Sequence, residues 1–246
     1  MPANRLTFGS LFAGIIGGFD LGFERAGMTC KWQVEIDPFC RKVLAKHWPN
    51  VMRHDDVRTF AIGDCDGLDV DVICGGFPCQ DISVASHTKT GLEGERSGLW
   101  RDFARIIGIL RPRFVVVENV AALLGNGMGI VLADLSAIGL DAEWSVVSAC
   151  AMGATHSRAR VFIVAYPTSE RRSKGLGRIR PQGLSVSEIN RRKSQEAWEL
   201  SVAAALRISD RSTNRLDRIR LRGLGNAVVP QVAEWIGRRI MELGRR

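Results

Sequence analysis

The chain has 246 residues, of which 46% are hydrophobic and 24% charged, as is ordinary for a soluble globular protein with one sizeable core. No run approaches the roughly 18 apolar residues that a membrane span needs, and the N-terminus has no separate apolar secretion segment, so we expect a cytoplasmic protein that does not enter a membrane. The net charge of +8 is concentrated in residues 168–222, which hold 14 Lys/Arg and 6 Asp/Glu, as in a polyanion-binding element or, equally, a solvated arginine-rich helix.

Strand and helix patterns alternate along the chain as far as Tyr166. Apolar runs predict strands at 6–12, 31–35, 70–75, 114–117, 143–149 and 161–165. Helical spacing predicts helices at 19–26, 37–48, 100–110 and 129–138. Residues 55–57 lie where a further strand would end. Alternation with short connections is typical of an α/β fold with a doubly wound, mostly parallel sheet.

The pattern changes after Pro167. Residues 168–196 are rich in Arg, Ser and Gly and poor in large apolar residues, so we expect a loop-dominated lobe there. Apolar helical spacing returns at 228–243, and this last helix is expected to pack back on the sheet. The sequence therefore predicts a main domain at 1–167, a small basic segment at 168–222 and a returning C-terminal part at 223–246.

The six cysteines form no CxxC pair and have no neighbouring histidine cluster. This scatter disfavours a zinc ribbon and a disulfide scaffold, and we predict no metal site. The default expectation for each cysteine is a buried, reduced thiol. The six are Cys30, Cys40, Cys65, Cys74, Cys79 and Cys150.

A glycine-rich turn at 12–18 connects the first predicted strand to the first predicted helix. Such a turn suits close backbone approach to a nucleotide-like ligand at a helix N-terminus, although a plain tight turn is the alternative. Glu35 ends the next strand about 20 residues on, where an acid can accept hydrogen bonds from ribose hydroxyls. Asp56 could bind an adenine edge, or it could be part of a solvated acidic turn.

The segment 75–80, Gly-Gly-Phe-Pro-Cys-Gln, follows an apolar strand directly. In an open α/β sheet the carboxyl ends of the strands line the ligand crevice. Pro78 stiffens the backbone just before the thiol, and the glycines let a substrate approach. We therefore expect Cys79, unlike the other cysteines, to be available for chemistry.

Glu118 follows a second apolar run. A carboxylate close to a core is costly unless it is used or paired, and desolvation would raise its pKa and keep it available as a proton donor. A helix-capping role is the alternative. Arg158 and Arg160, two residues apart on an extended chain, could hold an anion or a base carbonyl. The Gly225-Asn226 turn before the last helix could cover a bound cofactor.

Together these motifs resemble, in family order, those of the cytosine-C5 DNA methyltransferases, especially the compact forms of phages and prophages. The matches run over most of the chain and comprise the Phe-x-Gly…Gly-Gly loop at 12–18, Pro-Cys-Gln at 78–80, Glu-Asn-Val at 118–120, Arg-x-Arg at 158–160 and Gly-Asn-Ala-Val at 225–228. There are three departures. The first loop has Ile15 and Ile16 where one residue is usual, the segment where the family carries its target-recognition domain is short, and His156 stands where many members have Gln.

The resemblance implies a Rossmann-like, S-adenosylmethionine-dependent enzyme that methylates C5 of a flipped-out cytosine in double-stranded DNA. It also implies a monomer in a bacterial or phage-infected cell, with restriction-modification as the biological setting. Cys79 is implied as the nucleophile and Glu118 as the acid, with Arg158 and Arg160 steadying the loop and the flipped base. The implied cofactor-binding residues are Phe12, Ala13, Gly14, Gly17, Gly18, Glu35 for the ribose, Ile36 and Val57 on the two faces of the adenine, Asp56 at its amino group, Gly76, Pro78, Leu99, Asn226 and Val228.

Three other functions are compatible with parts of the pattern. An RNA cytosine-C5 methyltransferase would share the motifs, but it should differ around the nucleophile loop and lack the arginine-rich segment. A catalytically impaired, DNA-binding homologue is supported only by the Ile15-Ile16 insertion. A dinucleotide-dependent oxidoreductase would explain the glycine loop and Glu35 but not the segment 78–80.

Overall fold

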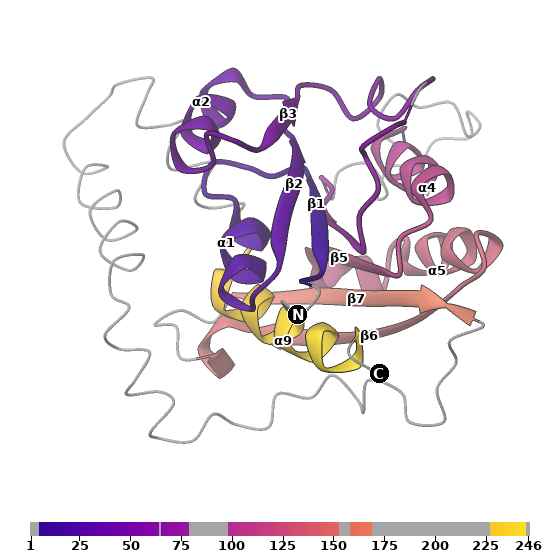
Figure 1. Ribbon diagram of the computed structural model, residues 1–246. Coiled ribbons are helices and arrows are strands. Elements are labelled where there is room, and N and C mark those ends of the chain that lie inside the picture. The colour runs from indigo at the N-terminus through magenta and orange to yellow at the C-terminus, as the bar shows by residue number, and fades with distance from the viewer. Residues whose placement is uncertain (1–4, 64, 79–97, 153–157, 169–226, 245–246) are drawn as a thin grey trace, which may run out of the picture.

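The computed structural model describes residues 5–63, 65–78, 98–152, 158–168 and 227–244, which form a seven-stranded sheet covered by helices (Figure 1). The strand order is β3-β2-β1-β4-β5-β7-β6. The neighbours from β3 to β5 are parallel, whereas β7 is antiparallel to both β5 and β6. The strands are β1 (Thr7–Leu11), β2 (Thr29–Val34), β3 (Met52–His54), β4 (Val72–Gly76), β5 (Phe114–Val120), β6 (Leu140–Ser148) and β7 (Ala159–Pro167). The predicted mostly parallel α/β fold is confirmed.

Helices cover both faces of the sheet, and Figure 1 shows α1 and α9 together on one face with α4 and α5 on the other. The helices are α1 (Gly18–Arg25), α2 (Pro38–His47), α4 (Gly98–Leu110), α5 (Met128–Ala137) and α9 (Pro230–Gly244), with short 3-10 turns η2 (Ala121–Leu124) and η3 (Ala149–Met152). In β5, Val115 and Val117 belong to one hydrophobic core, and Phe114 and Val116 belong to the other. A central strand covered on both faces is apolar at successive positions, which explains the continuous run in the sequence.

The predicted elements occur at the predicted places, with shifted ends. One shift affects the candidate site, because β7 begins at Ala159, two residues before the predicted start, and so Arg160 lies within the strand. Its pairing opposite Val120 of β5 holds it in the sheet. At the other end of the chain, Val232, Ile236 and Ile240 of α9 join a core that includes sheet residues. The predicted lobe at 168–196 lies, from residue 169 onward, outside the described residues.

The packing of α9 on α1 depends on small residues. A Cβ added at Gly22 would lie 2.5 Å from the Cβ of Ala233, and one added at Gly237 would lie 2.8 Å from the Cβ of Ala26. The chain just before α9 is equally close, since a Cβ at Gly18 would lie 2.2 Å from the Val228 carbonyl oxygen. The first and last helices therefore interlock at near-backbone contact.

Five of the six cysteines are described, and all five are free thiols. Cys30, Cys40 and Cys74 are buried as expected, and Cys65 is partly buried. Cys150 is exposed, contrary to the default expectation, because it lies in the short turn η3 that follows the edge strand β6. Within the ranges given above, no helix is both long and apolar enough to cross a membrane.

Candidate active site

The loop between β1 and α1 has an unusual backbone that is tied to the end of β2. Phe12, Gly14 and Gly17 all adopt positive φ, at 54°, 69° and 51°. The Ala13 amide donates a 3.1 Å hydrogen bond to the Val34 carbonyl. Ile15 is buried at 7% exposure, so the longer loop places this extra apolar side chain in the interior while Gly17 still caps α1.

Glu35 holds this loop through its carboxylate. One oxygen, Oε2, accepts a 2.8 Å hydrogen bond from the Gly14 amide, and Oε1 accepts one of 2.9 Å from the Asp37 amide. An ionised carboxylate can accept about four hydrogen bonds, so capacity remains for ligand hydroxyls. The neighbouring Ile36 side chain is 63% exposed, which leaves an apolar surface open beside the acid.

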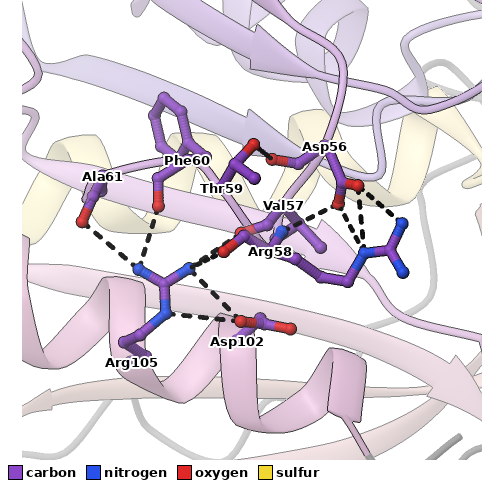
Figure 2. Close-up of polar contacts among 8 residues, drawn as sticks. All are labelled: Asp56, Val57, Arg58, Thr59, Phe60, Ala61, Asp102 and Arg105. Atoms are coloured by element: carbon purple, nitrogen blue, oxygen red, sulfur yellow. Dashed lines mark hydrogen bonds and ion pairs between the residues drawn. The ribbon is translucent and has the colours of Figure 1, made fainter. Parts of the chain in front are cut away.

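The loop after β3, residues 56–61, lies beside this strand end, because the Glu35 amide donates to the His54 carbonyl at 3.1 Å. Asp56 accepts hydrogen bonds from Arg58, which also lower the pKa of the Asp56 carboxyl (Figure 2). Val57 is 5% exposed and belongs to the core around α4. Of the two residues expected on either face of an adenine, Ile36 is therefore open and Val57 is covered by its neighbours.

Glu118 lies near the end of β5 with only 6% of its surface exposed. Its Oε1 is 3.1 Å from Nε of Arg160, but this oxygen accepts no hydrogen bond from the part of the chain that the structure describes. Burial raises the pKa of the Glu118 carboxyl to about 7, although the charges of Arg160 and Arg158 act in the opposite direction. This agrees with the predicted desolvated acid, and the structure brings both arginines to it.

The end of β4 lies directly against this acid. Gly76 pairs with Glu118 in the sheet, and a Cβ at Gly76 would lie 2.7 Å from Oε2 of Glu118. The next residue, Phe77, accepts a 3.0 Å hydrogen bond at its carbonyl from the side-chain amide of Asn119. Pro78 follows and is exposed. The predicted nucleophile Cys79 comes next and lies outside the described residues, as does Asn226.

Asn119 is a residue to which sequence reasoning gave no role of its own. It is 3% exposed, and besides its bond to Phe77 its Oδ1 accepts the Val120 amide at 2.8 Å. The available signal was a polar amide next to Glu118, directly after a predicted core strand. The remaining expected cofactor residues lie at two places, Val228 against Gly18 and Leu99 in the first turn of α4 beside the core.

Comparison with known proteins identifies the family of the chain. The family model for C-5 cytosine-specific DNA methylases matches residues 6–218. The chain belongs to this family. It is 30% identical over 234 residues to the Type II methyltransferase M.NgoFVII of Neisseria gonorrhoeae, a match covering 88% of this chain and 60% of that protein. It is 34% identical over 165 residues to the Type II methyltransferase M2.BsuMI of Bacillus subtilis strain 168, covering 63% of this chain and 41% of that protein. The chain thus spans about half the length of such relatives.

Solved structures show the same fold. Entamoeba histolytica methyltransferase EhMeth matches with a TM-score of 0.69 over 98% of this chain and 99% of that chain, at 15% identity. A prophage-encoded E. coli protein, assigned as a DNA modification methyltransferase, matches with a TM-score of 0.55 at 26% identity. The second match covers 67% of this chain and 47% of that one. Both proteins therefore share the mixed α/β architecture of this C-5 cytosine-specific methylase chain.

Proposed function

We propose that this C-5 methylase chain transfers a methyl group from S-adenosylmethionine to C5 of a cytosine in duplex DNA. The observation that carries the proposal is the buried Glu118, whose pKa is raised to about 7 and which lies against Gly76 at the end of β4. That strand end leads within three residues to Cys79. A proton donor beside a cysteine is what nucleophilic attack on a pyrimidine ring requires. Relatives named Type II methyltransferases support the same activity.

The residues at the neighbouring strand ends suit S-adenosylmethionine. Gly14 and Gly17 adopt the left-handed backbone that favours glycine, the space beside Gly14 is open to within 3.9 Å of the Phe12 carbonyl, and a helix N-terminus follows. Glu35 retains acceptor capacity for ribose hydroxyls, and Ile36 offers an exposed apolar face for the adenine. The cofactor, when bound, supplies a methyl group on a positively charged sulfur.

The side chains of this chain then activate the base. The Cys79 thiolate forms a bond to C6 of the cytosine, and the ring electrons move towards C5. Glu118 donates its proton towards ring N3 and so offsets the negative charge that develops there. C5 takes up the methyl group and the N3 proton returns to the Glu118 carboxylate. A base then removes the C5 proton, and the electrons of that C–H bond expel the thiolate from C6. The ring must leave the base stack for this to occur.

The positive residues hold the substrate in this proposal. Arg160 keeps Glu118 in place through the 3.1 Å contact, and with Arg158 it steadies the flipped base. In this proposal the chain has a catalytic part at 1–167, a basic segment at 168–222 and a returning part at 223–246. The basic segment binds the phosphates of the DNA backbone. We further propose that the protein acts as a monomer in the cytoplasm of a bacterial or phage-infected cell.

Methyl transfer with labelled S-adenosylmethionine tests the proposal on a mixed-sequence DNA duplex and on RNA of the same sequence. We expect label in the DNA, no label with Cys79→Ser, and full activity with Cys150→Ser, which removes an exposed thiol on η3. A duplex containing 5-fluorocytosine should trap a covalent adduct, because the C5 fluorine cannot leave as a proton does. If no label is transferred to DNA or RNA, the proposed methyltransferase activity is wrong. If only RNA is labelled, DNA is not the substrate. If Cys79→Ser is active, the covalent step through Cys79 is wrong.

A further inference from the structure

A single arginine of α4 gathers the backbone of the loop after β3 (Figure 2). Nη1 of Arg105 donates to the Phe60 carbonyl at 3.0 Å and to the Ala61 carbonyl at 3.3 Å. Nη2 donates to the Val57 carbonyl at 2.9 Å and to the Arg58 carbonyl at 3.4 Å. These acceptors lie 44 to 48 residues earlier in the chain. One guanidinium thus fixes most of the loop.

The loop has a physical need for such a partner. It is one helical turn, in which the Phe60 amide donates to the Asp56 carbonyl at 3.1 Å, and so short a turn has no later amides for its last carbonyls. Its end is also strained, since Ala61 has a φ of 56°. A planar guanidinium, with five donors and a permanent charge, can bind several carbonyls at the negative end of a turn, whereas a lysine ammonium cannot span them.

The orientation of Arg105 is itself fixed. Asp102, one turn earlier in α4, contacts Nη2 of Arg105 at 3.3 Å and Nε at 3.4 Å. On the inner side of the loop, the ring of Phe60 packs against Trp32 with centroids 4.7 Å apart. The loop is therefore held from inside by an aromatic contact and from α4 by charge. Leu99 lies in the first turn of the same helix, so one rigid element positions two parts of the expected cofactor pocket.

We propose that Arg105 is a positioning residue that sets the affinity for the adenine half of the cofactor, an inference that rests on the proposed function of this loop. Asp56 can receive the adenine amino group only if the loop keeps its conformation, in which Val57 is anchored in the core. Without Arg105, binding would have to order the loop and pay the entropy of doing so, which weakens affinity. The methyl-transfer step takes place at the Glu118 end of the site, so its rate at saturating cofactor should not change.

Arg105→Met is the informative variant, and Arg111→Met is its matched control. Arg111 directly follows the last residue of the same helix and also donates to two carbonyls, those of Gly108 at 2.9 Å and Ile138 at 3.1 Å, neither of which is in the loop. Calorimetry of the full chain should show S-adenosylmethionine and S-adenosylhomocysteine binding about 10- to 100-fold more weakly to Arg105→Met, with the control within about 2-fold of the parent. Arg105→Lys should restore little of the affinity, because charge alone cannot replace the fork.

Two further measurements separate positioning from general destabilisation. Adenosine alone should lose the same factor in affinity as the whole cofactor, and kcat at saturating cofactor should stay within about 2-fold of the parent. Hydrogen exchange of peptide 55–61 should rise in Arg105→Met but not in Arg111→Met. A parent protein that binds no S-adenosylmethionine overturns the proposed function. A parent that binds it, with an Arg105→Met protein that is folded and binds equally well, overturns the role of Arg105 alone.

Discussion

Replacing Glu118 with glutamine should change how the stability of the protein depends on pH. Burial raises the pKa of this carboxyl from 4.5 to about 7, so the folded protein holds a proton that the unfolded chain releases. The stabilisation from this proton is fully present below pH 4.5 and is lost as pH rises through 7. At about 1.4 kcal/mol per pKa unit, the loss amounts to about 3 kcal/mol. Glutamine cannot ionise, so the variant lacks this part of the pH dependence.

Urea unfolding of the parent and Glu118→Gln, followed by tryptophan fluorescence at several pH values from 4.5 to 8.5, measures the effect. All other titrating groups cancel in the difference between the two unfolding free energies. That difference should move by about 3 kcal/mol in favour of the variant as pH rises. Parallel curves over the whole range would show that the Glu118 carboxyl is not desolvated as described. In the same range, methyl transfer by the parent should fall above pH 7 as the proton donor is lost.

Two further substitutions test the packing around the proposed site. Gly18→Ala places a Cβ 2.2 Å from the Val228 carbonyl oxygen, so urea unfolding should show a loss of about 1–3 kcal/mol, and unchanged stability would contradict the close contact. Asn119→Ala removes the 3.0 Å hydrogen bond to the Phe77 carbonyl, two residues before Cys79, and should lower single-turnover methyl transfer by about 10- to 100-fold. Cofactor affinity should not change in Asn119→Ala. A loss of affinity with an unchanged methyl-transfer rate would show that Asn119 supports the cofactor site and not the segment that leads to Cys79.

Much of the fold could be predicted because local patterns carried it. The apolar run at 114–117 indicated a strand buried on both faces, and it lies in β5, an interior strand of the sheet. The strand continues to Val120 because Glu118 and Asn119 still pair with β7. Sequence alone gave no reason to extend it, since two polar residues usually end a buried strand. The raised pKa of the Glu118 carboxyl could be predicted from the same apolar neighbours.

What could not be predicted depends on contacts between distant segments. In the sequence Arg105 is one cation in an amphipathic helix, where solvent exposure is the ordinary expectation. Its carbonyl partners come within hydrogen-bonding distance only because α4 packs beside the loop after β3, and the sequence does not show this packing. Asp20 is similar, because it is fully buried in α1 and burial raises its pKa. It accepts hydrogen bonds from Gln33 of β2 at 2.8 Å and Ser10 of β1 at 3.1 Å, so its partners come from two other elements.

The interlocked first and last helices have a consequence for synthesis on the ribosome. The glycine loop at 12–18 is among the earliest segments to emerge, but the carbonyl of Val228 that lies against Gly18 is made more than 200 residues later. Chains are extended at about 5–20 residues per second, so the two segments are separated by at least about 10 seconds. During that interval the face of α1 that later receives Ala233 is without its partner. An mRNA truncated before the codon for residue 228 would therefore encode every proposed catalytic residue. The protein made from it would still lack the contacts of Val228 and α9 that support the glycine loop and α1.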